Sequence, residues 1–280
     1  MNRTGQIATT GVTRITDAGS SPAEDVLAVE EPLEIRIAFD EDGERVEKSI
    51  SITMRTPGED LDLACGFLLS ESILRSAGDI AAIHHCGPAA DGVQNVVRVE
   101  LREGLAIDYR RLERHFYTSS SCGVCGKSSI EALHLASIQP LPRDLPALRS
   151  EVIHALPERL RRGQEVFAST GGLHAAGLFA PDGELISVHE DVGRHNAVDK
   201  LVGRACLDRR LPLADRILMV SGRASFELVQ KALAAGIPAM AAVGAPSSLA
   251  VDLARTWGMT LIGFVRDKRF NIYSGKWRLA

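Results

Sequence analysis

Cys122 and Cys125 are the residues whose type and spacing most directly indicate chemistry. They lie in the stretch SSSCGVCGKSSIEAL, residues 119–133. A capping-box pattern in this stretch predicts a helix that starts near Ser129. At a helix N-terminus the unpaired backbone N–H groups and a nearby Lys127 favour a thiolate. The stretch therefore predicts at least one thiol that is reactive at neutral pH.

Several chemistries fit this pair of thiols. A zinc site needs two further ligands, which only Cys86 with His84 or His85 supplies. A zinc deaminase would show an HxE motif before the thiols and a proline before Cys122, and the sequence has neither. A thioredoxin-like dithiol normally follows a core strand, whereas YTSSS precedes this one. The third possibility is a sulfur carrier, in which one thiol takes up a sulfur atom as a persulfide and the second thiol assists its transfer. The small flanking serines and glycines argue against a buried structural pair.

A second group of polar residues lies between Thr170 and Lys200. It comprises His174, His189, Glu190, Asp191, Arg194, His195, Asn196 and Asp199. The motif HEDVGRHN ends an apolar strand and begins a helix, a place where open α/β sheets bind ligands. Asp191 as a helix N-cap and Arg194 with Asp199 as a salt bridge are simpler interpretations, and the roles of the three histidines stay open.

Two later strand-to-helix junctions place glycine and serine where helix N–H groups bind anions. They are SGRASFE, residues 221–227, and GAPSSLA, residues 244–250, and their candidate binding residues are Ser221, Arg223, Ser247 and Ser248. Each junction alone is weak evidence. Together with the basic stretch VRDKRF after the last long strand, they predict a ligand that carries phosphate.

Composition describes an ordinary globular chain. Of 280 residues, 45% are hydrophobic and 24% charged, and the net charge of −4 gives no reason to expect nucleic acid as a partner. No apolar run approaches the length of a signal peptide core or a membrane span, so we expect a cytoplasmic protein with no membrane partner. Its thiols are then reduced, and Cys65 and Cys206 fit helical core positions.

The pattern along the first part of the chain predicts an N-terminal arm and a small domain. Residues 1–25 lack periodicity and are expected to be mobile. Residues 26–115 predict a small α+β domain. Within it we expect a hairpin of strands 33–39 and 49–55, a helix over 59–75, and strands 80–86 and 95–101.

Residues 116–280 predict an α/β domain that carries the CxxC stretch. We expect a helix ending near Ser137, a proline-rich connector and a helix over 148–162. The remaining segments are expected as strands 174–180 and 185–192, helix 194–206, strand 216–222, helix 225–236, strand 239–244, helix 248–258, strand 260–266 and an edge strand over 270–274. This alternation favours a largely parallel sheet.

Several long motifs resemble the FdhD family of sulfur carrier proteins required for formate dehydrogenase activity. They are SSSCGVCGKSS, TGGLHAAGL, EDVGRHNAVDK, SGRASFELVQKA, GAPSSLAVDLA and GFVRDKRFNIY, and the resemblance runs from about residue 30 to residue 275. It implies a C-terminal domain with a three-layer, cytidine-deaminase-like fold without the zinc site. It also implies a sulfurtransferase that accepts sulfur from a cysteine desulfurase. The sulfur passes to the molybdenum cofactor, bis(molybdopterin guanine dinucleotide), before that cofactor enters formate dehydrogenase.

The resemblance also implies site residues and partners. Cys122 corresponds to the residue that carries the persulfide and Cys125 to its partner. The family's cofactor-binding segment matches Phe264, Val265, Arg266, Asp267, Lys268 and Arg269. The cofactor with its guanine nucleotide ends would be a bound substrate, with no permanently bound cofactor or metal, and the protein a homodimer by analogy. Rival interpretations are a non-catalytic chaperone of the cofactor and a zinc-binding deaminase-like protein.

Overall fold

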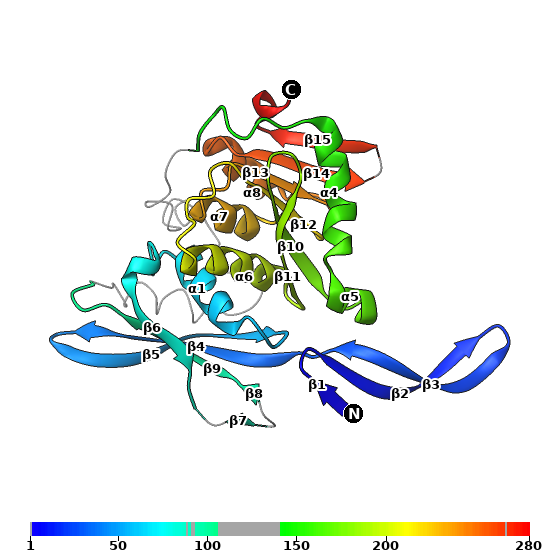
Figure 1. The fold of residues 1–280 in the computed structure, drawn as a ribbon, viewed down its shortest axis with the longest axis horizontal. Coiled ribbons are helices and arrows are strands. Elements are labelled where there is room, and N and C mark those ends of the chain that lie inside the picture. Colours follow the sequence, from blue (N-terminus) through cyan, green and yellow to red (C-terminus); the bar gives the residue numbers. More distant parts are fainter. Residues whose placement is uncertain (1, 88, 91–92, 106–140, 267) are drawn as a thin grey trace.

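The largest sheet of the protein has six strands in the order β11-β10-β12-β13-β14-β15 (Figure 1). This computed structural model describes residues 2–87, 89–90, 93–105, 141–266 and 268–280. The strands are β10 (His174–Phe179), β11 (Leu185–Asp191), β12 (Ile217–Val220), β13 (Ala239–Ala242), β14 (Thr260–Arg266) and β15 (Arg269–Ser274). Each corresponds to a strand predicted from the sequence, and β15 is an edge strand as expected.

The direction of the strands differs from the largely parallel sheet that we expected. Only β12, β13 and β14 run parallel to one another, whereas β10, β11 and β15 join by antiparallel pairing. The reason is connection length. Residues 180–184 between β10 and β11, and the two residues between β14 and β15, are too few for the crossover that a parallel pair requires.

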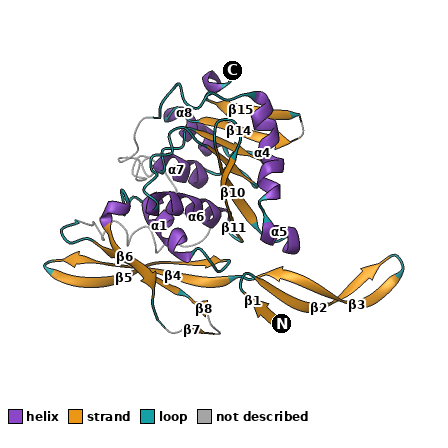
Figure 2. Cartoon of the chain, in the orientation of Figure 1, coloured by secondary structure: helices purple, strands orange, loops and turns teal. Residues whose placement is uncertain are grey.

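Helices cover both faces of this sheet (Figure 2). One face packs against α6 (Arg194–Leu207), α7 (Phe226–Ala234) and α8 (Ser248–Thr256), and the other packs against α4 (Ser150–Arg162). Successive residues of β12 alternate between the two cores: Leu218 and Val220 face the first, Ile217 and Met219 the second. Burial on both faces explains why the central strands are short continuous apolar runs.

A second, four-stranded sheet lies below α1 and α6 and has the order β5-β4-β9-β6. Its strands are β4 (Glu31–Glu41), β5 (Glu44–Arg55), β6 (Ile80–His85) and β9 (Val96–Leu101), and the hairpin β4–β5 was predicted. Helix α1 (Asp60–Ser70) joins this sheet to α6 through a contact between glycines. A Cβ on Gly66 would lie 1.9 Å from Asp199 O, and one on Gly203 would lie 1.8 Å from Asp62 O. Only glycine therefore allows the two helix backbones to approach this closely.

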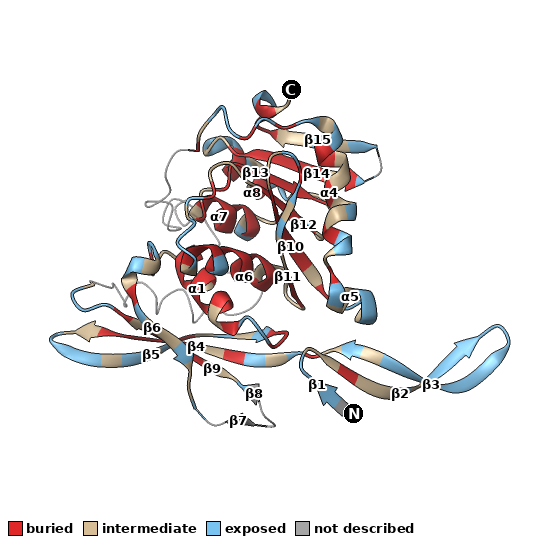
Figure 3. Ribbon diagram, in the orientation of Figure 1, coloured by how far each residue is buried: buried red, intermediate tan, exposed pale blue. Residues whose placement is uncertain are grey.

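The N-terminal segment is ordered as strands, which corrects the expectation of an arm without regular structure. Strands β1 (Asn2–Thr4), β2 (Ile7–Thr16) and β3 (Gly19–Ala28) form an antiparallel sheet whose hairpin extends away from the body (Figure 3). Most side chains on both faces of the hairpin are exposed. A strand with no buried face has no hydrophobic alternation, so the usual strand signal is missing from this sequence.

Smaller differences concern element ends and short elements. Helix α1 ends at Ser70, not near Arg75 as predicted. Ser72 has a left-handed backbone (φ 59°), and the backbone N–H groups of Ile73 and Leu74 both donate to Leu68 O, so the helical hydrogen-bond pattern stops there. The short helix α5 (Glu165–Thr170), the pair β7 (Ala89–Ala90) and β8 (Val93–Gln94), and the 3₁₀ turns η1 (Ala77–Asp79) and η3 (Lys276–Arg278) were not predicted. The helix expected near 129–137 and the boundary at 115 lie outside the described residues.

In the part of the chain that the structure describes, no helix has both the length and the apolar character needed to span a bilayer.

Candidate functional site

The ends of the three parallel strands form one continuous edge. The loop between β12 and α7 lies beside the loop between β13 and α8, and Gly244 N donates to Gly222 O at 2.9 Å. Phe264, near the end of β14, donates its backbone N–H to Gly244 O at 3.0 Å. The two strand-to-helix junctions that the sequence singled out are therefore neighbours, together with the start of the basic stretch.

Gly244 is needed for this arrangement. A Cβ at this position would lie 3.0 Å from Arg223 Cγ and 3.1 Å from Gly222 O. Both distances are shorter than a comfortable carbon contact, so a larger residue would push the two loops apart. The absence of a side chain thus brings the backbone of one junction against the other.

Four residues were predicted at the junctions from the sequence alone: Ser221, Arg223, Ser247 and Ser248. Ser221 is half-buried, and its hydroxyl oxygen accepts a hydrogen bond from Ala175 N at 2.9 Å. Ser247 is the N-cap of α8 and accepts from Ala250 N at 3.3 Å. Arg223 and Ser248 are exposed. The structure therefore places all four at one edge, with two of the hydroxyls already engaged by backbone N–H groups.

The segment matched by family resemblance continues this edge into the turn between β14 and β15. Arg266, Lys268 and Arg269 are exposed, and none forms an ion pair with another described residue. Phe264 has φ 55°, which is uncommon for a residue with a side chain, and lies where the β14–β15 register shifts. Within the described residues, no ion pair therefore competes with an anion for these basic side chains, and the Arg266 guanidinium lies 5.8 Å from the ring centroid of Phe264.

The side chain of Val265 is completely buried in the core beside α4, so it cannot reach a ligand at the surface except through its backbone. Asp267 lies outside the described residues, and so do Cys122 and Cys125.

Cys65 and Cys206 occupy core positions, as the sequence predicted, and Cys86 is partly buried. Cys65 and Cys206 are buried in the core between α1 and α6. A hydrogen bond between the two thiols, together with burial, raises the pKa of Cys65, so Cys65 is an inert thiol. Within the described ranges no three His, Cys, Asp or Glu side chains are grouped to hold a metal ion.

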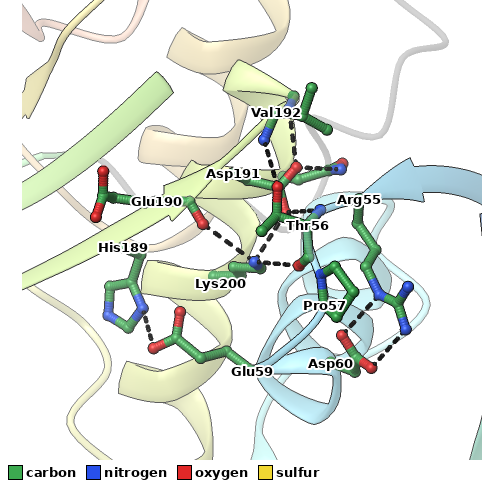
Figure 4. Close-up of polar contacts among 12 residues, drawn as sticks. Arg55, Thr56, Pro57, Glu59, Asp60, His189, Glu190, Asp191, Val192 and Lys200 are labelled. Carbon is green, nitrogen blue, oxygen red and sulfur yellow. Dashed lines mark hydrogen bonds and ion pairs between the residues drawn. The ribbon is translucent and has the colours of Figure 1, made fainter. Parts of the chain in front are cut away.

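The polar residues near HEDVGRHN divide into groups with different roles, and the first joins the two sheets (Figure 4). Lys200 Nζ lies 2.8 Å from Asp191 Oδ2, and both side chains are completely buried. The ammonium also donates to Thr56 O and Glu190 O, at 3.0 and 3.1 Å. Asp191 accepts from Gly193 N at 2.8 Å but is not the N-cap of α6, which is Gly193 itself.

A second group lies between α6 and α7. Asp199 pairs with Lys231 at 2.8 Å and accepts from Ser70 Oγ at 3.0 Å, so the expected pair of Arg194 with Asp199 is replaced by one from another helix. Burial raises the pKa of Asp199, and Lys231 opposes that rise. His195 Nε2 lies 2.6 Å from Glu227 Oε2, and this hydrogen bond lowers the pKa of Glu227.

The remaining histidines occupy different surroundings. His189 is buried with Nδ1 2.9 Å from Glu59 Oε1, which is a contact between β11 and the start of α1 (Figure 4). His174 begins β10 and lines a cavity of about 520 Å³ together with Ser221. Burial first, and then the positive charges of Arg194 and His195, lower the pKa of His174. His174 therefore shares a cavity with Ser221 of the first junction, and His195 contacts Ser225 and Glu227 of the same junction.

The same cavity contains residues that the sequence did not single out. Gln164 and Phe167 belong to the short helix α5 or precede it, and both line the cavity. Glu190 caps this helix from β11: its carboxylate accepts from Val166 N at 2.9 Å and from Phe167 N at 2.8 Å. A helix of six residues is too short to show a hydrophobic period, so nothing in its sequence could have identified this wall.

The comparisons with known proteins agree with one another. The model of the FdhD/NarQ family matches residues 28–280. A protein of Streptomyces coelicolor called sulfur carrier protein FdhD is 53% identical over 274 residues, covering 96% of this chain and 94% of that protein. A protein of the same name from Anaeromyxobacter dehalogenans is 49% identical over 91% of this chain and 89% of its own length. A crystal structure of a proposed formate dehydrogenase accessory protein from Desulfotalea psychrophila has the same fold, with a TM-score of 0.74, 24% identity and coverage of 98% of this chain and 100% of its own.

Proposed function

Because the chain belongs to the FdhD/NarQ family, we propose that it is a sulfur carrier that supplies the molybdenum cofactor of a formate dehydrogenase with sulfur. The observation that carries this proposal is 53% identity, over nearly the whole chain, to a protein named for sulfur carriage. The sequence also contains the pair of thiols, Cys122 and Cys125, that such chemistry requires.

In the first step the Cys122 thiolate attacks the outer sulfur of a persulfide on a cysteine desulfurase. A new S–S bond forms at Cys122 while the S–S bond of the donor breaks, and the donor cysteine leaves as a thiolate that takes up a proton. Because one S–S bond replaces another, this transfer needs no external oxidant or reductant. Cys122 is the nucleophile and then the carrier.

In the second step the sulfur leaves for the cofactor. The Cys125 thiolate attacks Cys122 Sγ, forms a Cys122–Cys125 disulfide and expels the outer sulfur as hydrosulfide, which the molybdenum of the cofactor accepts. The two thiols thereby supply the two electrons that convert the persulfide sulfur to sulfide. A cellular dithiol reductant must then reduce the disulfide before the next cycle.

The cofactor is the substrate of this reaction, and we place its phosphates at the strand-end edge. Supporting this assignment are the exposed cations Arg266, Lys268 and Arg269, which lack ion-pair partners among the described residues, and Arg223 on the adjacent loop. Guanidinium groups bind phosphate through paired hydrogen bonds. Ser221, Ser247, Ser248 and Phe264 border the same edge.

The finer assignments of fold and partners belong to the same proposal. We assign residues 116–280 to a cytidine-deaminase-like fold, which the helices on both faces of a mixed six-stranded sheet support. A cysteine desulfurase would be the sulfur donor and a formate dehydrogenase the recipient of the cofactor. The protein would act in the cytoplasm as a homodimer.

The test is intact-protein mass spectrometry after incubation with a cysteine desulfurase and cysteine. The wild-type protein should gain the mass of one or more sulfur atoms, and Cys122→Ala should gain none. Cys86→Ala, which removes a thiol outside the CxxC pair, is the matched control and should be loaded normally. Cys125→Ala should accumulate persulfide on Cys122 yet fail to activate the dehydrogenase.

Two results would count against the proposal. Full activation of formate dehydrogenase by a variant lacking both Cys122 and Cys125 would leave only a chaperone role. Zinc in the purified protein, combined with no gain of sulfur, would favour the metal site.

A further inference from the structure

A tryptophan is exposed near the C-terminus, on the side of the molecule opposite the four-stranded sheet (Figure 1). Half of the surface of Trp277 is accessible, and so is half of the surface of Leu145 in the segment before α4. A large exposed aromatic side chain is uncommon on a surface that contacts only water. With their neighbours Arg143, Lys276 and Arg278, these two residues form a surface that we call the Trp277 patch.

Arg278 fixes this patch from below. Only 3% of its surface is exposed, and its guanidinium donates hydrogen bonds to oxygen atoms of two neighbouring segments. The acceptors are Leu145 O at 2.8 Å, Gly258 O at 2.8 Å, Thr260 Oγ1 at 3.1 Å and Pro142 O. These bonds hold the turn η3 against the segment before α4 and the start of β14. The patch is thus ordered before a partner binds, which lowers the entropic cost of binding.

The charge of Arg278 is not neutralised by any carboxylate that the structure describes. All of its acceptors are neutral, and it forms no ion pair with a described residue. Burial first, and then the positive charge of Arg143, lower the pKa of Arg278, and the exposed Asp144 opposes this change. A carboxylate from another molecule would supply the missing negative charge.

Two guanidinium groups lie near the indole ring. The Arg143 guanidinium carbon is 5.3 Å from the ring centroid of Trp277, and that of Arg278 is 5.7 Å from it. Both distances fall within the range of cation–π contacts. The ring therefore has positive groups beside it and an exposed surface that an apolar side chain can cover.

Further exposed cations border the patch. Lys276 directly precedes Trp277, and Arg255 Nε donates to Tyr273 O at 3.3 Å. Neither cation forms an ion pair within the described part of the chain, and the same is true of Arg143. Tryptophan and arginine are enriched among the residues that contribute most to binding in protein interfaces. The composition and the unpaired positive charge together point to a negatively charged protein partner.

We propose that the Trp277 patch docks an acidic segment of a partner protein. An apolar side chain of that segment contacts Trp277 and Leu145, and neighbouring carboxylates pair with Arg143 and Lys276. A nucleic acid or an anionic membrane would require a broad basic face, whereas these cations gather around a single ring.

The patch is separate from the strand-end edge. Gly258 and Thr260, which Arg278 contacts, lie at the start of β14, whereas Arg266 ends this strand. Seven residues of extended chain place the two ends about 20 Å apart. Docking at the patch therefore goes beyond the proposed sulfur transfer and leaves the basic turn accessible.

Tryptophan fluorescence tests the proposal, because the chain has two tryptophans and Trp257→Phe leaves Trp277 as the single reporter. The probe is a synthetic peptide that alternates glutamate with leucine, and the matched peptide has lysine in place of glutamate. We expect the acidic peptide to shift the emission of Trp277 to shorter wavelength in a saturable manner, with an affinity that falls as salt rises. The lysine peptide should cause no shift.

Substitutions then test the individual contacts by calorimetry with the same acidic peptide. Arg143→Gln and Trp277→Ala should each weaken binding about tenfold, because one loses a charge-assisted contact and the other the apolar surface. Arg14→Gln, which removes an exposed arginine from the N-terminal hairpin, is the matched control and should leave the affinity unchanged. Thermal unfolding of each variant separates loss of binding from loss of fold.

Several outcomes would overturn the proposal. They are no saturable shift with the acidic peptide, equal binding of the acidic and lysine peptides, and equal affinities of wild type and a folded Arg143→Gln variant. A dimer in sedimentation that Trp277→Ala dissociates would show that a second copy of the chain covers the patch, and would also overturn it. Cys122→Ala should bind the acidic peptide as wild type does, so these outcomes are independent of the sulfur chemistry.

Discussion

Lys200 Nζ lies 2.8 Å from Asp191 Oδ2 with both side chains completely buried, and this pair fastens the segment before α1 to β11 and α6. Lys200→Met should destabilise the protein by about 3–5 kcal/mol, because Asp191 would be left as a buried charge without its partner. Denaturant unfolding measures the effect. The double variant Asp191→Asn with Lys200→Met should recover part of this loss, and a double variant no more stable than Lys200→Met would contradict the explanation.

Glu190 should stabilise α5 although it belongs to β11. Glu190→Ala removes the acceptor of two backbone N–H groups and should cost about 0.5–2 kcal/mol, the usual size of a lost cap. Hydrogen exchange of the Val166 and Phe167 amides should accelerate in the variant. Glu165→Ala changes an exposed carboxylate in the same helix and should leave this exchange unchanged. Unaltered exchange in Glu190→Ala would show that α5 does not depend on this cap.

Gly244→Ala should disturb the strand-end edge. The added Cβ would meet Arg223 Cγ at 3.0 Å, and overpacking of this kind costs about 1–3 kcal/mol. We also expect weaker binding of GDP, measured by calorimetry, because the loop that carries Arg223 must shift. Gly11→Ala is the matched control, since a Cβ on Gly11 in the exposed hairpin would meet nothing within 4 Å. Equal stability of the two variants would show that the loops yield easily.

The basic turn should bind phosphate. The double variant Arg266→Gln with Arg269→Gln should weaken GDP binding about tenfold or more and reduce its dependence on salt, because two charge-assisted contacts are lost. Arg14→Gln removes an exposed arginine from the N-terminal hairpin and serves as the control. GDP affinity that is the same in the double variant and in wild type at low and high salt would remove this turn from the binding site.

His174 should titrate below its usual range. Burial and the charges of Arg194 and His195 lower its pKa in the folded state below the ordinary value of 6.5. Between the two pKa values the unfolded chain binds more protons than the folded chain, so this group reduces stability as the pH falls below 6.5 and has no effect well above it. Histidine NMR measures the midpoint.

Arg194→Gln should raise the pKa of His174 only in part, because burial is the larger cause. Arg210→Gln, past the C-terminus of α6, should leave it unchanged. A His174 midpoint at or above 6.5 in the wild-type protein would contradict the structural account.

The sequence alone predicted most of the strands and helices and the two strand-to-helix junctions that border the strand-end edge. Period-two and period-3.6 patterns predicted β4, β5, β6, β9 and the strands and main helices of the six-stranded sheet, because each buries a continuous face. The predicted order of strands and helices also implies that the junctions with Ser221 and Ser247 follow neighbouring parallel strands. Successive parallel strands end at the same edge, so this relationship needs no knowledge of distant contacts.

Only the tertiary structure decided which side chains meet across elements. Asp199 pairs with Lys231, not Arg194, because α7 packs beside α6 and brings an ammonium group to a carboxylate 32 residues earlier. The sequence of β2 and β3 shows no regular hydrophobic alternation, because neither face of their hairpin is buried. Helix α5 is capped by Glu190 of β11, which lies 24 residues after the Val166 amide that donates to it. Such pairings depend on how the folded helices and strands pack against one another. The spacing of residues along the chain does not determine which side chains that packing brings into contact.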